Sequence, residues 1–305
     1  MSYVDRTLYL TWQLSFDHIK QQNDLSAKIL QLWAYFDNQD VWFELLHHGD
    51  KDDPDWFLRL TDDEVEFTKA MRVLCNHSLA EVYVSSDKRV ESGGYGMHSC
   101  VHAWTMHVLN QEADIELARL ALKCVASHAP RKEANKPWIT QRRLIQHGIR
   151  CWYMAEEGVI EWDGLEWAWH SCGNLFSDQG RLGEAEKMYD RALQGYEKAW
   201  GSDHTETLDT VNNLGNLYAR QGRLEEAEKM YDRALQGYEK ALGSTQVRTF
   251  MPALNTMENL AYLCAETDRR ERAKVLYLRA LPRLEAVLGS ESTRCKGITA
   301  AIESL

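Results

Sequence analysis

His98 and His102 stand one helical turn apart, and this spacing allows two imidazoles to bind one zinc ion. His107 follows a little more than one turn later, but no acidic third ligand lies nearby in the sequence. Histidines with structural roles occur at the same spacing, so a structural role is the competing interpretation. We therefore expect no metal site in this chain.

Motifs that would indicate catalysis are missing from the sequence. There is no G-x-x-x-x-G-K-[ST] phosphate loop, and the glycine-rich run from Gly93 to Gly96 lacks the lysine that such a loop needs. There is also no G-x-S-x-G nucleophile elbow. We expect neither enzymatic activity nor a bound cofactor.

The composition of the 305 residues is that of a globular protein. The net charge is -11 and there is no basic block, which argues against nucleic acid or an anionic membrane as a partner. The seven cysteines are scattered, without a C-x-x-C pair, as in reduced intracellular proteins. We expect a cytoplasmic location. Only five prolines interrupt the chain, so the fold should be mainly α-helical.

The strongest pattern is an internal repeat in the second half of the chain. The segment from Gln179 to Ala199 recurs forty-two residues later, from Gln221 to Ala241, with Gly183 against Glu225 as the one difference. A weaker third copy runs from Asn259 to Leu281. Because the copies are so similar, we expect them to form the same structural unit.

Each copy has the apolar spacing of two antiparallel helices. Val211, Leu214 and Tyr218 share one face of a first helix, and Gly215 lets the second helix approach it closely. The pattern resembles the tetratricopeptide repeat in its kinesin-light-chain variety, which implies an α-solenoid that binds a protein or peptide. We expect an array over residues 163–305 with repeats at about 165–200, 207–242 and 253–288, followed by a C-terminal cap.

The same resemblance implies a concave face lined by the first helices. Taking Val211 as a buried position places a row of polar side chains on that face, where amides can donate to and accept from an extended peptide backbone. Solvation of an exposed helix is the competing interpretation for any single residue. The expected peptide-binding residues are His170, Asn174, Asp209, Asn212, Asn216, Arg220, Asn255, Glu258 and Tyr262.

Residues 1–110 have a different pattern. We expect a helix over residues 8–19 with Leu8, Trp12, Phe16 and Ile19 on its buried side. The other expected elements are helices at 26–36, 41–46 and 62–77, a strand at 80–85, a loop at 87–94, a return strand at 95–98, and a helix that Ser99 caps. Helices followed by a small hairpin and a last helix form the plan of a winged-helix-like domain.

A second resemblance concerns this first half. Four segments resemble the winged-helix segment of fungal NB-ARC/NLR-like STAND signalling proteins: Thr11–Phe16, Leu32–Asp37, Phe67–Leu79 and Met97–Trp104. Met97-His98-Ser99 falls on the Met-His-Asp motif of that family, in which the histidine contacts the phosphate of the nucleotide. Ser99 departs from the aspartate of the motif. Residues 111–162 resemble the connecting helices, expected at Ile115–Ser127 and Trp138–Tyr153.

Two functions follow from these patterns. The first is a protein–protein interaction module, in which the repeats recognise a peptide or protein within an intracellular signalling or nonself-recognition protein. The alternative is a regulatory fragment of an NB-ARC-type NTPase whose nucleotide site is completed by residues outside this chain. ADP or ATP would then bind only with an upstream NB-ARC module, and His98 would contact the nucleotide. DNA binding through a winged helix is a weaker idea that the acidic charge opposes.

Overall fold

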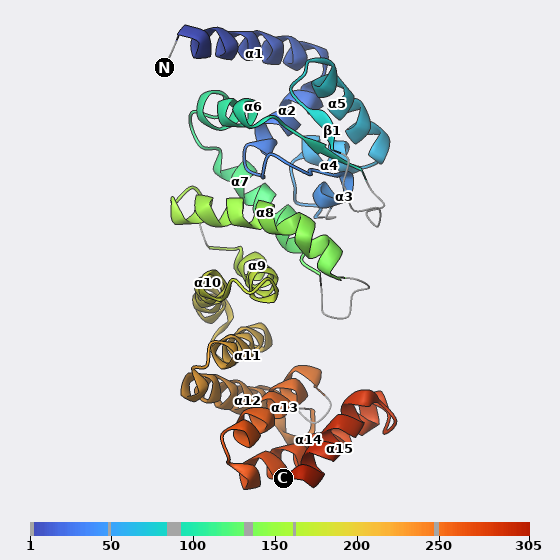
Figure 1. The fold of residues 1–305 in the computed structure, drawn as a ribbon, viewed down its shortest axis with the longest axis vertical. Helices are drawn as coiled ribbons and strands as arrows, with labels where there is room; N and C mark the ends of the chain where they lie inside the picture. Colours follow the sequence, from blue (N-terminus) through green and yellow to red (C-terminus); the bar gives the residue numbers. More distant parts are fainter. Residues whose placement is uncertain (1–2, 48–49, 84–92, 131–136, 161–162, 247–249) are drawn as a thin grey trace. The chain divides into compact units, whose positions relative to one another are not determined.

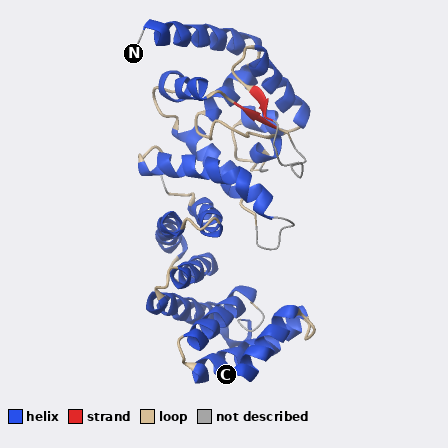
Figure 2. Cartoon of the chain, in the orientation of Figure 1, coloured by secondary structure: helices blue, strands red, loops and turns tan. Residues whose placement is uncertain are grey.

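A computed structural model describes residues 3–47, 50–83, 93–130, 137–160, 163–246 and 250–305. The chain forms two compact units, residues 1–162 and 163–305, and helices dominate both (Figures 1 and 2). None of the helices in the described ranges combines the length and the apolar character that crossing a membrane requires.

The first unit is a cluster of helices with one small antiparallel sheet. Strands β1 (Glu81–Tyr83) and β2 (Gly94–Gly96) form this sheet (Figure 2). Val82 pairs with Tyr95, and Tyr95 also bridges to Val41. Most of the loop expected at residues 87–94 lies outside the described residues. The elements in chain order are α1 (Tyr3–Gln22), α2 (Asp24–Trp33), α3 (Phe43–Leu46), α4 (Asp55–Thr61), α5 (Glu64–Asn76), β1 (Glu81–Tyr83), β2 (Gly94–Gly96), α6 (Ser99–Trp104), the π-helical turn η1 (Thr105–Leu109), α7 (Ile115–Ser127) and α8 (Pro137–Glu156). The winged-helix interpretation of residues 1–110, and their separation from residues 111–162, stay predictions.

Helix α1 packs through a narrower stripe than its sequence predicted. Phe16 and Ile19 are buried, and the ring centroid of Phe16 lies 6.4 Å from that of Trp104. Leu8 is 46% exposed, so its predicted burial was wrong. The apolar periodicity of a helix gives the direction of its buried face, but the neighbouring elements decide how much of that face is covered.

The start of α6 also differs from the prediction. The helix begins at Ser99, and His98 rather than Ser99 occupies the capping position. The Nδ1 atom of His98 accepts a hydrogen bond from the backbone N–H of Cys100 at 3.2 Å. The imidazole nitrogen therefore does what the Ser99 hydroxyl was expected to do, because it satisfies an N–H that the first turn leaves unpaired.

The buried His147 of α8 forms hydrogen bonds to the segment that follows α2. The Nδ1 atom of His147 accepts a hydrogen bond from the backbone N–H of Asp37 at 3.1 Å, so its Nε2 donates to the carbonyl of Asp40 at 3.2 Å. The guanidinium of Arg143 holds both carboxylate oxygens of Asp40, at 2.7 and 2.8 Å. Burial lowers the pKa of His147, which favours the neutral ring that this arrangement requires.

The second unit consists of helical pairs in sequence. In each pair we call the earlier member the first helix and the later member the second helix. The first helices are α9 (Glu166–Asp178), α11 (Thr205–Arg220) and α13 (Met251–Glu266). The second helices are α10 (Leu182–Trp200), α12 (Leu224–Gln246) and α14 (Arg270–Leu288), and α15 (Thr293–Ser304) follows them.

The turn inside each pair uses a residue in the left-handed backbone region. Gly180 and Gly222 have φ angles of 76° and 77°, and Asp268 takes the same place in the third copy with a φ of 58°. The residue after each of them donates its N–H back to the helix, as Arg223 does to the carbonyl of Tyr218 at 2.9 Å. This closes the end of each first helix and reverses the chain.

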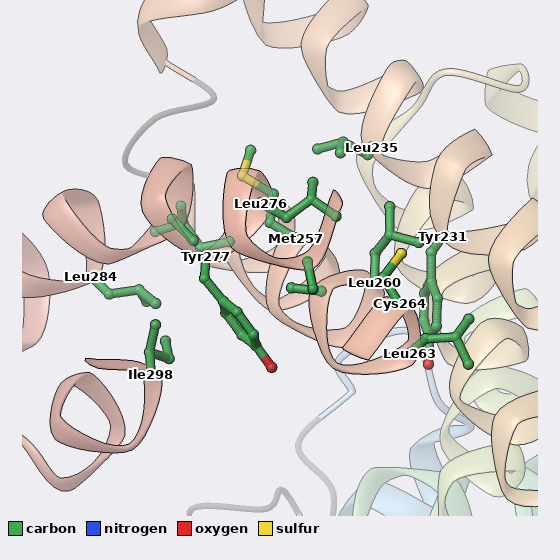
Figure 3. Close-up of a cluster of buried hydrophobic side chains, with 14 of the residues drawn as sticks. Tyr231, Leu235, Met257, Leu260, Leu263, Cys264, Leu276, Tyr277, Leu284 and Ile298 are labelled. Carbon is green, nitrogen blue, oxygen red and sulfur yellow. The ribbon is translucent and has the colours of Figure 1, made fainter. Parts of the chain in front are cut away.

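Neighbouring pairs share clusters of buried apolar side chains. Figure 3 shows Tyr231 of α12 beside Leu260 and Cys264 of α13, and Leu284 of α14 beside Ile298 of α15. Each of these side chains is buried. One pair thus completes the core of the next, which is why a single copy cannot be stable alone.

Glycine permits the closest contact between the two helices of a pair. A Cβ atom added at Gly215 would lie 2.7 Å from the ring of Tyr231, and one added at Gly173 would lie 2.6 Å from the ring of Tyr189. Both distances are shorter than a carbon–carbon contact allows. The sequence prediction that Gly215 brings the second helix close is confirmed by this geometry.

We predict that Gly215→Val lowers the free energy of unfolding by about 1–3 kcal/mol, because the new side chain overpacks the contact with Tyr231. Urea unfolding of the full chain, followed by circular dichroism, measures this change. The control is Gly183→Ala, since a Cβ at Gly183 meets nothing within 4 Å and alanine is the better helix former. Equal midpoints for Gly215→Val and the unsubstituted chain would contradict the prediction.

Candidate functional site

Side-chain amides join the first helices of neighbouring repeats. The Nδ2 atom of Asn213 on α11 donates to Oδ1 of Asn174 on α9 at 3.0 Å. One repeat later, Nδ2 of Asn259 on α13 donates to Oδ1 of Asn216 on α11 at 2.8 Å. We call these four residues the amide ladder, and the face of α9, α11 and α13 that carries them the first-helix face.

Tyrosines of the second helices fix the orientation of two ladder residues. The hydroxyl of Tyr189 donates to Oδ1 of Asn174 at 2.7 Å, and the hydroxyl of Tyr231 donates to Oδ1 of Asn216 at 2.8 Å. Each Oδ1 atom therefore accepts two hydrogen bonds, one within its own repeat and one from the next. Within the described part of the chain, neither Nδ2 of Asn174 nor Nδ2 of Asn216 has a hydrogen-bond partner. Two amide donors are thus held in a set direction without an internal acceptor.

Asn212 has a more internal role than the sequence predicted. Its Oδ1 accepts from the hydroxyl of Thr256 at 3.0 Å and from Nδ2 of Asn259 at 3.3 Å. Its own Nδ2 donates to Oδ1 of Asn213 at 3.4 Å. Asn212 therefore links α11 to α13 in parallel with Asn216.

His170 stands in the first copy where Asn212 stands in the second. Its Nδ1 lies 2.8 Å from the hydroxyl oxygen of Thr210, and its Nε2 lies 3.3 Å from Nδ2 of Asn213. Because the Thr210 hydroxyl donates to the carbonyl of Glu206, the contacts fit a neutral ring protonated at Nδ1. Burial lowers the pKa of His170 to about 4, while the negative charge of Glu206 acts in the opposite direction.

Two more of the expected residues have partners within the array. The carboxylate of Asp209 accepts a hydrogen bond from the hydroxyl of Tyr238, and burial raises the pKa of this carboxyl. The guanidinium of Arg220 donates to the backbone carbonyl of Ser177 at 2.8 Å and to its hydroxyl at 2.7 Å. Both residues lie on α11, and each would have to share or exchange these bonds to contact a ligand.

The third first helix departs from the pattern of the others. Arg294 of α15 donates to Oδ1 of Asn255 at 2.6 Å and to a carboxylate oxygen of Glu258 at 2.7 Å. Tyr262 occupies the position that Asn174 and Asn216 occupy in the earlier copies, and it is 62% exposed. The amide ladder therefore ends at α13, and an exposed aromatic ring follows it.

The sequence prediction missed four residues of this face. Asn213 and Asn259 complete the ladder, Thr210 contacts His170, and Arg294 contacts α13. One sequence signal could have identified Asn213 and Asn259 as ladder residues. Asparagine recurs at this position in the second and third copies, whereas the position before it changes from Asn212 to Glu258.

His98 and His102 both make hydrogen bonds within the first unit. His98 is exposed and caps the helix, whereas Nε2 of His102 lies 3.0 Å from the carbonyl of Phe36 and 3.3 Å from that of Trp33. In the described ranges, no three His, Cys, Asp or Glu side chains are grouped so that they could hold a metal ion. These contacts favour the structural interpretation of the histidine pair.

We predict that His170 makes the array lose stability in acid. The pKa of a histidine in an unfolded chain is near 6.5, and burial lowers that of His170 to about 4, so its contribution is complete above pH 6.5 and declines towards pH 4. The unfolding free energy should fall by about 2–3 kcal/mol more in the unsubstituted chain than in His170→Asn over that interval. Urea unfolding at a series of pH values measures the difference.

The control for this prediction is His107→Asn, which removes an exposed histidine from the first unit. That variant should keep the pH dependence of the unsubstituted chain. Parallel curves for His170→Asn and the unsubstituted chain would show that His170 does not titrate as described.

Comparisons with known proteins agree with the repeat pattern. Residues 164–240 match one model of the tetratricopeptide repeat, and residues 253–293 match another. A search of curated proteins found no match.

Among solved structures, the chain is similar to a crystal structure of a variant of nearly identical TPR-like repeats from Podosopora anserina, described under the name kinesin light chain. That similarity has 13% identity, a TM-score of 0.47, and coverage of 61% of this chain and 84% of the other. It is also similar to BtubC (BKLC) from P. vanneervenii, with 17% identity, a TM-score of 0.45, and coverage of 64% and 80%. With the family matches and the helical pairs together, the second unit is an α-solenoid of tetratricopeptide repeats, and such repeats generally mediate protein–protein interactions.

Proposed function

We propose that the second unit binds an extended segment of another protein on its first-helix face. The observation that carries this proposal is the pair of preset donors, Nδ2 of Asn174 and Nδ2 of Asn216. An extended peptide offers a backbone carbonyl every residue, and side-chain amides are suited to bind it whatever its side chains are. Because internal hydrogen bonds already orient both donors, binding requires little further ordering of these side chains.

The spacing of the donors suits such a ligand. Packed helices lie about 8–10 Å apart, and an extended chain advances about 3.3 Å per residue. Asn174 and Asn216 occupy the same place on adjacent first helices, so their partners in the peptide would be about three residues apart. Three first helices together would contact about six to eight residues of ligand.

The other residues of the face would take secondary roles in this proposal. His170 and Asn212 would mainly hold the ladder, and Asp209, Arg220, Asn255 and Glu258 would contact the ligand by sharing their present bonds. Tyr262 would supply an apolar contact, since its ring is exposed. We place this binding in an intracellular signalling or nonself-recognition protein on the strength of the resemblance of the first unit alone.

The alternative, a regulatory fragment of an NB-ARC-type NTPase, rests on His98. This side chain is exposed, so it is accessible to a nucleotide phosphate supplied together with residues outside this chain. Isothermal titration of the full chain with ADP, in the presence of an added NB-ARC module, tests the alternative. Micromolar binding that His98→Ala abolishes would favour the alternative over a stand-alone interaction module.

We predict that Asn174→Asp combined with Asn216→Asp weakens peptide binding about tenfold or more. Aspartate keeps the Oδ1 acceptor that the tyrosine hydroxyl and the next asparagine use, but replaces the Nδ2 donor with an oxygen that repels a peptide carbonyl. Peptides of about ten residues are first selected from a random pool on the immobilised full chain. Fluorescence anisotropy then gives their dissociation constants with each variant.

The matched control is Gln194→Glu combined with Gln236→Glu. These residues are exposed at equivalent positions on α10 and α12, and the substitutions add the same charge away from the first-helix face. The control should bind as the unsubstituted chain does. If no peptide is retained, or if both double variants bind equally well, the proposed function is wrong.

A further inference from the structure

The charges of the second unit are divided unequally between its two sets of helices. The first helices α9, α11 and α13 together carry six Asp or Glu residues and one Lys or Arg residue, a net charge of −5. The second helices α10, α12 and α14 together carry eleven of each kind, so their charges cancel. The excess negative charge of the array therefore belongs to the helices that form the first-helix face.

The charges of the second helices are used between repeats. Arg272 of α14 lies 2.6 Å from the carboxylate of Asp232 on α12, and Arg233 of α12 pairs with Glu197 on α10. Arg279 and Glu239 repeat that last contact one pair further along. Acidic and basic residues of these helices thus neutralise each other inside the array.

Two acidic residues of the first helices, Glu206 and Glu266, have no lysine or arginine counterpart among the described residues. Glu266 is exposed and has no partner within the described residues. Glu206 is exposed, and its carboxylate contacts the neighbouring His204 at 3.0 Å rather than a lysine or an arginine. Burial raises the pKa of Asp209, and the negative charge of Glu206 acts in the same direction. Two acidic side chains therefore lie close together at this end of α11.

The basic groups on this face do not remove the excess. Arg220 donates to Ser177, which is neutral, and Arg294 of α15 neutralises Glu258. Two aromatic rings are exposed at first-helix positions, Trp167 at 39% and Tyr262 at 62%. Such rings attract the cationic ends of lysine and arginine side chains.

We propose that the ligand of the first-helix face is a basic, extended segment of a protein. This inference rests on the proposed function and adds the side-chain chemistry of the ligand to it. The amide ladder would hold the peptide backbone, while lysine and arginine side chains would reach the carboxylates of Glu206 and Glu266 and the exposed aromatic rings. An acidic segment would be repelled by the same face.

The test uses the immobilised full chain and one equimolar mixture of three synthetic pools of ten-residue peptides. In each pool four positions are fixed, as lysine or arginine, as aspartate or glutamate, or as serine or asparagine, and the rest are random. Mass spectrometry of the retained peptides should show the basic pool enriched about tenfold or more over the acidic pool at low salt. The enrichment should fall steeply as salt is raised, because these contacts are exposed.

A pair of matched variants assigns the preference to this face. Glu206→Gln combined with Glu266→Gln should weaken binding of a selected basic peptide about three- to tenfold. Glu225→Gln combined with Glu271→Gln removes the same charge from exposed positions on the second helices and should change binding less than twofold.

The outcomes separate this inference from the proposed function. Equal or greater retention of the acidic or neutral pool, lost on Asn174→Asp with Asn216→Asp, would overturn the basic ligand and leave peptide binding standing. Equal weakening by the two glutamine double variants would also overturn it. Retention of none of the three pools would overturn both.

Discussion

In the first two repeats, a tyrosine of the second helix lies against a glycine of the first helix, so closely that a Cβ atom would not fit. The polar face depends on this contact. The glycine is followed directly by an asparagine, as in Gly173-Asn174 and Gly215-Asn216, and the tyrosine hydroxyl bonds to that asparagine. The glycine that permits the close approach of the tyrosine is therefore next in the chain to the asparagine that accepts the hydrogen bond of the tyrosine. Core packing and the direction of the amide donors are therefore consequences of one contact.

The third repeat shows what happens when this contact changes. Ala261 and Tyr262 replace the glycine and the asparagine, so the hydroxyl of Tyr277 has no asparagine at the equivalent place. Arg294 of α15 makes polar contacts with Asn255 and Glu258 of the same helix, α13. The end of the ladder is thus built from different chemistry, with a guanidinium in place of an amide and an exposed ring in place of a donor.

The repeats and their helices were predictable from the sequence, because apolar spacing and turn residues are local signals. The helix Ile115–Ser127 was expected from the resemblance to connecting helices, and the structure has it with the same bounds and with the Asp114 side chain as its cap. The burial of Leu8 was predicted wrongly, because the sequence of α1 does not show how far its neighbours extend. Asn213 and Asn259 were missed for a related reason. Whether two amides on different helices meet depends on how the helices are offset along their axes, and side-chain periodicity within one helix does not contain that offset.

The asparagines of the ladder join stability and recognition in one side chain. Oδ1 of Asn216 holds three helices together, because it accepts from Tyr231 on α12 and from Asn259 on α13 while belonging to α11. Its Nδ2 is set by those same bonds. A truncation to alanine would remove the structural acceptor together with the donor, and any loss of binding would then have two explanations. A substitution by aspartate keeps the side-chain shape and the Oδ1 acceptor, so it separates the structural role from the binding role. The hydrogen bonds to Oδ1 also orient the Nδ2 donor, which therefore needs no further contact to fix its direction.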